Sequence, residues 1–455
     1  MKLLIKKFVV LFALSLIMLL FVDCSSFNKA DYKCENCNVL FILVDTLRAD
    51  HLSSYGYYRN TSPNIDSFAE DAILFENVRS QASCTHPSVP SILTSKYSHN
   101  FLKVNRSKII PDHIKSVAEI LKEKNYRTFA VSANPIVRKT PFAKYKFAGF
   151  DKGFDIFDEG CLGRKAPCLN EKFFDFIENS SQPFFTYLHY MDPHSLYSSP
   201  IKKFSKTYDG ENEFIAKGNH KPIKEKLYQK GSYKYTKMDI DYLMDLYDDE
   251  IAYFDSQFKV LIDKLSQENL TNNTIVIISS DHGEEFLEHG DIAHCHNLFD
   301  DTNKVPLIIK IPGIVKRGKR KSWVQNIDIV PTLLDYLGFD IKNYGFDGKN
   351  LRPVIASDKS INDYVFSLQD TLRSTNNDQH KLIYDIGSKE FSLFDLITDK
   401  NEKENLYNFE EKISEALKKK LFKWLYVTEG KNVSSQQNVD DSKKILKKLK
   451  EIGYL

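Results

Sequence analysis

The side chains best suited to chemistry are concentrated in one segment, TIVIISSDHGEEFLEHGDIAHCH, which runs from Thr274 to His296. Its β-branched start predicts a buried parallel strand, so Asp281 and His282 should emerge together at the carboxyl end of that strand. Ligands bind at this edge of open α/β sheets. A carboxylate and an imidazole are ordinary ligands of Zn, Mn or Fe, so the segment predicts part of a metal site. Taken alone, the same residues are also compatible with a solvated turn after a strand.

A second strand of the same kind precedes Asp45. Val39 to Val44 is a continuous apolar run, which is typical of a strand buried on both faces, and Asp45 follows it directly. We therefore expect Asp45 to join Asp281 and His282 as ligands of a single divalent cation.

A third segment, SCTHPSVPSILTSKYSHN, offers a nucleophile. Thr85 comes just before an apolar helical start, so its hydroxyl would lie at a helix N-terminus, which favours anions. Read alone, Thr85 is an N-cap. Beside a cation held by Asp45, Asp281 and His282, Thr85 becomes a candidate nucleophile and a fourth ligand, because coordination lowers the pKa of a hydroxyl.

The elements that must position these residues alternate along the chain. This alternation predicts an α/β fold with a large, mostly parallel sheet sandwiched by helices. The end of the chain predicts a small C-terminal antiparallel sheet and a Lys-rich amphipathic helical tail. The helices are expected at 115–125, after Asn170 and at 242–267, and the strands at 128–134, 183–194, 274–280, 364–369, 380–386 and 390–396.

Bulk composition fits a globular protein. The 455 residues carry a net charge of +2, with 27% charged and 42% hydrophobic residues, and this charge suggests no nucleic-acid partner. Five regions are predicted: an export segment at 1–24, a linker at 25–37, a main catalytic domain at 38–355, a C-terminal subdomain at 356–408 and a helical tail at 409–455.

The N-terminus has the pattern of an export signal. Basic residues at Lys2, Lys6 and Lys7 precede an apolar run that ends at Val22. Cys24 follows this run and resembles the lipidated cysteine of bacterial lipoproteins. A lipoprotein, a soluble exported protein and an uncleaved membrane anchor are the three alternatives, and all three imply the cell envelope or the exterior.

The cysteine count agrees with export. If Cys24 carries lipid, the other six of the seven cysteines can form pairs. Cys161 and Cys168 bracket a short loop and are the predicted disulfide. Cys34 and Cys37 form a CxxC motif in the linker, where a redox role is not expected.

Several motifs in sequence order resemble the sulfatases of the alkaline phosphatase superfamily. VDTLRADHL begins at Val44, TxPSxxSxLT at Thr85, HYMDPH at His189 and SDHGEEFLEHG at Ser280. The resemblance covers most of the chain, and it implies an alkaline phosphatase-like fold and a metal-dependent ester hydrolase.

The chain also departs from the sulfatase pattern. Sulfatases proper use a Cys or Ser that is oxidised to formylglycine, whereas Thr85 stands in that place and Val89 replaces the expected Arg. Thr46 replaces a metal aspartate, and His282 replaces the usual Asn. Oxidation of a threonine would give a ketone, so these departures favour phosphodiester or phosphonate ester hydrolases over sulfate ester hydrolases.

The resemblance also implies roles for residues around the metal. His194 and His294 are expected to protonate the leaving oxygen. Asp192 is expected to orient a histidine. His189, His296, Lys103 and Asn134 are expected to bind the substrate. The cation is expected to be Mn, Zn or Ca.

Two alternatives stay open beside a hydrolase of small-molecule, glycan or lipid esters. One is an exported transferase that uses Thr85 to carry a phosphoryl headgroup to an acceptor. The other is a non-catalytic member of the family that binds an anionic glycan. The N-terminus is the expected place of any membrane association.

Overall fold

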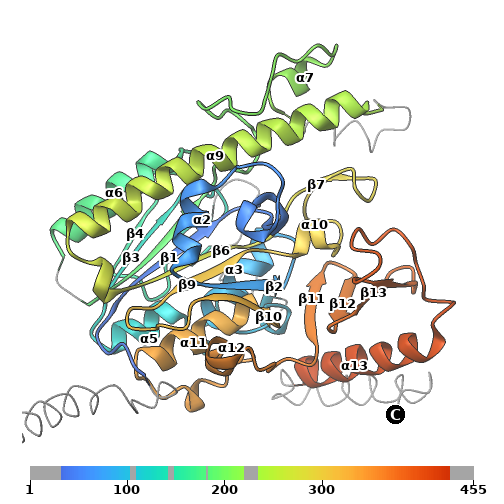
Figure 1. The fold of residues 1–455 in the computed structure, drawn as a ribbon. Helices are drawn as coiled ribbons and strands as arrows, with labels where there is room; N and C mark the ends of the chain where they lie inside the picture. The colour runs from blue at the N-terminus through green and yellow to red at the C-terminus, as the bar shows by residue number, and fades with distance from the viewer. Residues whose placement is uncertain (1–31, 103–108, 142–147, 181–182, 220–233, 431–455) are drawn as a thin grey trace, which may run out of the picture. The chain divides into compact units, whose positions relative to one another are not determined.

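A single sheet of eight strands dominates the fold (Figure 1). The computed structural model describes residues 32–102, 109–141, 148–180, 183–219 and 234–430. The strand order is β10-β2-β9-β6-β1-β5-β3-β4, and every neighbouring pair is parallel except the two that involve β9. The strands are β1 (Asn38–Val44), β2 (Ile73–Arg79), β3 (Arg127–Ser132), β4 (Ile156–Asp158), β5 (Phe184–Tyr190), β6 (Thr274–Ser280), β9 (Leu307–Lys310) and β10 (Gly318–Gln325).

The three central strands β5, β1 and β6 are buried along their whole length. Their apolar runs suit this position, because parallel strands covered on both faces are hydrophobic throughout. In register, Val44 of β1 lies beside Tyr190 of β5 and Ser280 of β6. The strands therefore end together, and the residues that follow them meet at one edge of the sheet.

Helices cover both faces of the sheet (Figure 1). On one face, α2, α6 and α9 pack onto Leu40, Ile42 and Val44 in one continuous apolar cluster. On the other face lie α3, α5, α11 and α12. The helices are α2 (Pro63–Glu70), α3 (Thr85–Thr94), α4 (His99–Leu102), α5 (Val117–Glu123), α6 (Ala166–Glu178), α7 (Glu213–Ala216), α9 (Lys237–Gln267), α10 (Asp300–Asn303), α11 (Ile329–Tyr336), α12 (Arg352–Ser357) and α13 (Glu411–Gly430).

Capping residues explain where two of the predicted helices begin. Ser116 accepts a hydrogen bond from the backbone of Glu119 and starts α5, and Thr236 does the same with Asp239 at α9. Such reciprocal caps satisfy N–H groups that have no partner within the helix. The cap at Thr236 lets α9 begin earlier than the expected Tyr242.

The predicted C-terminal sheet is confirmed. β11 (Val365–Gln369), β12 (Leu372–Asn376), β13 (His380–Asp385) and β14 (Phe391–Asp395) form an antiparallel sheet in sequence order. Leu417, Leu421 and Leu425 of α13 pack against it in one apolar cluster. Their spacing of four residues puts them on one face of the helix, which buries them and leaves most of the lysines, such as Lys419 and Lys423, exposed.

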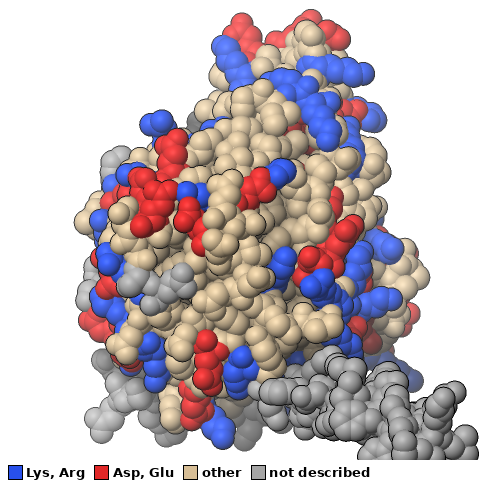
Figure 2. Space-filling model, turned by 60° about the vertical axis from the view of Figure 1, so that its left-hand side comes forward, with Lys and Arg blue, Asp and Glu red and all other residues tan. Residues whose placement is uncertain are grey.

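Several predictions fall outside the described residues: the export segment, Cys24, Lys103 and the tail beyond 430. Within the described ranges, no helix is both long and apolar enough to cross a membrane. The face in Figure 2 shows basic and acidic side chains interspersed, as the near-zero net charge leads one to expect. The boundaries of the five predicted regions stay predictions.

Candidate active site

Three buried side chains meet where β1, β5 and β6 end. Asp45 follows β1, His189 lies at the end of β5, and Asp281 follows β6. One ligand atom from each of the three lies within 4.8 Å of the others, close enough to share a metal ion. His189 Nε2 is 3.3 Å from Asp45 Oδ2, and all three side chains are fully buried.

The hydrogen bonds of this cluster leave ligand atoms unused. Asp281 Oδ1 accepts from the backbone N–H groups of His282 and Thr46, at 3.0 and 3.4 Å. Within the described residues, Asp281 Oδ2, Asp45 Oδ1 and His189 Nε2 have no hydrogen-bond partner. Buried polar atoms without partners are rare and costly, so their clustering fits a site for a divalent cation.

The electrostatics of the cluster point the same way. Burial and the nearby Asp45 carboxylate raise the pKa of Asp281 above its usual value. Burial by itself lowers the pKa of His282, but the charges of Asp281 and Asp45 outweigh burial and raise it. Two buried carboxylates at close range repel each other, and a divalent cation would relieve that repulsion.

His282 presents an imidazole nitrogen to the same centre. Its Nδ1 donates to the backbone oxygen of Gly283 at 2.9 Å, since a carbonyl oxygen can only accept. In the neutral imidazole Nε2 is then the nitrogen with a free lone pair, and it lies 3.4 Å from Asp281 Oδ2 and 3.9 Å from Asp45 Oδ1.

Thr85 is the first residue of α3, and its hydroxyl faces this centre. Thr85 Oγ1 is 3.1 Å from His282 Nε2 and 3.5 Å from Asp45 Oδ2. Ser88, one turn along the helix, donates its hydroxyl to the backbone oxygen of Asp281 at 2.7 Å. This bond ties the start of α3 to the end of β6, so the Thr85 and Ser88 positions of the TxPS motif have separate tasks.

A cavity of about 650 Å³ opens above Thr85. His294 and His194 lie in its wall, with their ring centroids 5.3 Å apart, and His294 lies 4.4 Å from the ring of His282. His294 Nδ1 is 3.1 Å from Glu284 Oε1, and burial lowers the pKa of His294 to about 4. With this pKa the imidazole of His294 is neutral near pH 7.

The remaining wall of the cavity contains groups that the sequence prediction missed. One is the Cys84–Cys295 disulfide, and another is the segment that carries Arg164 and Lys165. The ammonium of Lys165 pairs with buried Glu250 at 2.6 Å. Within the described residues, no acidic side chain pairs with Arg164. The loop between Cys161 and Cys168 was predicted only as a disulfide-closed loop. Its two adjacent cations, Arg164 and Lys165, are the sequence feature that could have indicated an anion-binding role.

Of the other residues predicted to bind substrate, some line the cavity and some do not. Asn134 Nδ2 donates to Asp45 Oδ2 at 2.5 Å and also lines the cavity. His189 belongs to the buried cluster instead of the substrate cavity. His296 Nε2 bonds Glu285 at 2.6 Å and is not brought into the cavity wall.

Asp192 was expected to orient a histidine, and it contacts a different partner. Its Oδ1 accepts from the backbone N–H of Ala166 at 3.1 Å, and burial raises its pKa to about 7. It therefore braces the start of α6. The predicted Cys161–Cys168 disulfide is present, and Cys34 is bonded to Cys37.

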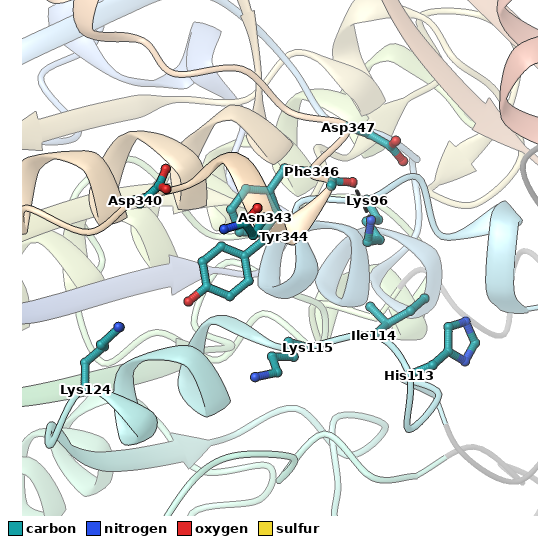
Figure 3. Close-up of a pocket in the computed structure, with 11 residues that line it drawn as sticks. Lys96, His113, Ile114, Lys115, Lys124, Asp340, Asn343, Tyr344, Phe346 and Asp347 are labelled. Carbon is teal, nitrogen blue, oxygen red and sulfur yellow. Dashed lines mark hydrogen bonds between the residues drawn. The ribbon is translucent and has the colours of Figure 1, made fainter.

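Two other features resemble sites but lie apart from Thr85. Glu285, His289 and Asp301 form a second group of possible ligands, but His289 already bonds Asp301 at 3.1 Å, and Glu285 receives His296 and Asn297. A second cavity of about 640 Å³ lies beyond the far end of α3, beside Lys96 and Tyr344 (Figure 3). In it, Lys96 donates to the backbone of Gly345 at 2.6 Å.

Two protein-family models match this chain. The family model described as Sulfatase matches residues 37–339, which is more than half of the chain. This chain belongs to the sulfatase family. A second model, the C-terminal part of N-sulphoglucosamine sulphohydrolase, matches residues 288–427 of this sulfatase-family protein.

Curated relatives of this family member are sulfatases by name. Human iduronate 2-sulfatase is 28% identical over 355 residues, which are 64% of this chain and 62% of that protein. The N-acetylglucosamine-6-O-sulfatase of Bacteroides thetaiotaomicron is 22% identical over 420 residues, 74% of this chain and 73% of the relative. The chain thus spans about three fifths of the human iduronate 2-sulfatase.

Solved structures confirm the fold. A 2-O GAG sulfatase superposes with a TM-score of 0.69 at 17% identity, covering 88% of this chain and 94% of the other. The phosphonate monoester hydrolase of Agrobacterium radiobacter gives 0.68 at 18% identity, with 87% and 96% covered. The fold is therefore shared by enzymes named for sulfur esters and for phosphorus esters.

Proposed function

We propose that this sulfatase-family protein hydrolyses an ester of a tetrahedral oxyanion, with Thr85 as the nucleophile. The observation that carries the proposal is the position of the Thr85 hydroxyl, 3.1 Å from His282 Nε2 and 3.5 Å from Asp45 Oδ2 at the base of the cavity. A hydroxyl beside unsatisfied metal-ligand atoms and below an open cavity is suited to attack an ester that enters from the cavity.

The metal would be held by Asp45, Asp281 and His189, whose unpartnered atoms cluster, together with His282. A bound divalent cation would supply Lewis acidity, which stabilises negative charge on the ester oxygens. The residues fit one cation of the kind that accepts mixed carboxylate and imidazole ligands, such as Mn or Zn.

The side chains of the cavity have separate tasks in the proposed reaction. Asn134 holds Asp45 through its amide and faces the substrate. His194 and His294 lie near each other in the cavity wall and would contact the leaving oxygen. The negative charge of an incoming ester favours protonated imidazole and so opposes the burial that lowers the pKa of His294.

Sulfur and phosphorus esters are each favoured by one observation. The relatives named as sulfatases favour sulfuric esters. Thr85 favours phosphorus esters, because a threonine cannot be oxidised to the formylglycine of sulfatases. It carries a single hydroxyl, so water would have to cleave its adduct by attack at the sulfur or phosphorus atom. The shared chemistry is a singly or doubly charged tetrahedral ester, and a substrate panel separates the two classes.

The test compares the native protein with Thr85→Ala on aryl sulfate, phosphate monoester, phosphodiester and phosphonate ester, each with Mn, Zn and Ca. Thr85→Ala is expected to lose activity by about 1,000-fold or more, while Thr85→Ser keeps measurable turnover. Thr94→Ala, at the other end of α3, is the matched control, since its hydroxyl donates to the backbone oxygen of Pro90 within the same helix. Full turnover in Thr85→Ala would show that the nucleophile lies elsewhere.

We further propose export to the cell envelope, which fits three disulfides and the N-terminal pattern. Fractionation of cells that make the full chain tests this location. Adding an acceptor alcohol to the assay tests the transferase alternative: a transferase would move the acid group to the acceptor, and a hydrolase would release it to water.

A further inference from the structure

One disulfide joins the two sides of the proposed reaction centre. Cys84 directly precedes Thr85, Cys295 directly follows His294, and the two cysteines are bonded across a sequence separation of 211. Both cysteines line the cavity. The link therefore runs between the segment that carries the nucleophile and the segment that carries the leaving-group histidine.

Hydrogen bonds reinforce the same junction. The backbone N–H of Cys295 donates to the backbone oxygen of Ser83 at 2.8 Å. The hydroxyl of Ser83 donates to the backbone oxygen of Asn297 at 2.6 Å. These two bonds lie next to the disulfide, and the bond from Ser88 to Asp281 joins the same two segments closer to β6.

The backbone around His294 needs such a restraint. Ala293 and Cys295, on either side of His294, have φ values of 79° and 75°. This left-handed region is unfavourable for residues other than glycine, and such conformations persist only where surrounding contacts enforce them. Loss of the disulfide would remove the covalent part of this restraint, and any relaxation of the turn toward ordinary backbone angles would move the imidazole.

We infer that the Cys84–Cys295 disulfide is a positioning device that holds His294 in register with Thr85. The inference rests on the proposed function. The other two disulfides differ in kind, because Cys34–Cys37 and Cys161–Cys168 close local loops with separations of 3 and 7 residues. Neither of them joins two segments of the reaction centre.

The test is the ratio of kcat values for two esters of the same acid, one with a poor alkyl leaving group and one with a good nitrophenyl leaving group. The poor leaving group depends on a well-placed proton donor, and the good one does not. In Cys84→Ala/Cys295→Ala the ratio of poor to good is expected to fall about tenfold or more, because small misplacements of catalytic groups are costly. The ratio does not depend on how much of the preparation is folded.

The matched control is Cys34→Ala/Cys37→Ala, which removes a disulfide at the start of β1, far along the strand from Asp45. Its ratio is expected to equal that of the native protein. An unchanged ratio in Cys84→Ala/Cys295→Ala, with only a lower melting temperature, would mean that the bond is merely stabilising and would overturn the inference.

If the double variant does not fold, the folded native protein is reduced instead. A phosphine and one water then give the phosphine oxide as the S–S bond becomes two thiols, and mass spectrometry confirms the thiols of Cys84 and Cys295. A ratio that falls on reduction but is unchanged in a Cys161→Ala/Cys168→Ala variant supports the inference, and an unchanged ratio on reduction overturns it. Absence of turnover in the native protein on every ester would instead count against the proposed function.

Discussion

At the scale of single residues, the decisive feature is a pair of buried carboxylates with unsatisfied oxygens. Asp45 Oδ1 and Asp281 Oδ2 have no hydrogen-bond partner within the described residues, and both side chains are fully buried. The imidazoles of His189 and His282 lie within 3.3 and 3.4 Å of the two carboxylates, but two buried carboxylates at close range still repel each other. His189 Nε2 lies in the same place, 3.3 Å from Asp45 Oδ2, so the three side chains fit the ligand set proposed for a divalent cation.

Replacing Asp281 with Asn tests this interpretation. Asp281→Asn should lower bound metal and activity together, with activity down more than roughly 100-fold, because even residues behind metal ligands cost about 10–100-fold. Elemental analysis and turnover of the purified protein measure the two quantities. Asp241→Asn, on exposed α9 surface, is the control and should keep both. An unchanged metal content in Asp281→Asn would rule out its role as a ligand.

At the scale of elements, the loop between β4 and α6 is held rigidly at the cavity. The Cys161–Cys168 disulfide closes it, the N–H of Gly163 donates to the oxygen of Ala133 at 2.8 Å, and Asp192 bonds the N–H of Ala166. Arg164 therefore projects from a braced support. Among the described residues, Arg164 has no acidic partner. Its guanidinium is therefore suited to bind a second anionic group on the substrate.

Arg164→Ala should therefore change specificity more than chemistry. For an ester that carries a second carboxylate, sulfate or phosphate, kcat/KM is expected to fall about 10–100-fold, the usual value of a charged hydrogen bond. For a simple aryl ester, kcat/KM should change little. Lys172→Ala on α6, whose ammonium pairs with Asp158, is the matched control. Equal losses on both esters would contradict a specific role for Arg164.

At the scale of the whole molecule, the candidate metal site joins three strands that are distant in sequence. Its residues come from β1, β5 and β6, the central strands of the sheet. A ligand that binds only the folded state stabilises the fold by mass action, and a metal held between strands is such a ligand. Metal occupancy and global stability are therefore expected to rise and fall together.

Removal of the metal should lower the melting temperature. A cation present at 1,000 times its dissociation constant stabilises the fold by roughly 4 kcal/mol, so chelation should cost several degrees. Thermal unfolding with and without a chelator measures the shift. In Asp281→Asn the chelator should have little further effect, because little metal is bound. If the melting temperature of the native protein is the same with and without the chelator, the protein holds no stabilising metal ion.

Much of the fold was accessible from the sequence, since it depends on local patterns. The apolar run before Asp45 and the β-branched run before Asp281 predict buried strands, and both strands lie at the centre of the sheet. The leucines of α13 predict a helix with one apolar face, and that face is buried. Strand length, helix periodicity and caps are encoded in neighbouring residues, so they can be predicted without knowing the fold.

The sequence by itself determined which residues follow strands and which motif precedes a helix, and so predicted Asp45, Thr85, Asp281 and His282 as one centre. Only the tertiary structure decided which way the other side chains face. It turned His189 inward toward Asp45, paired His296 with Glu285, and joined Cys84 to Cys295 across the chain. These choices depend on strand order and on contacts between distant segments, and neither is encoded in local sequence patterns.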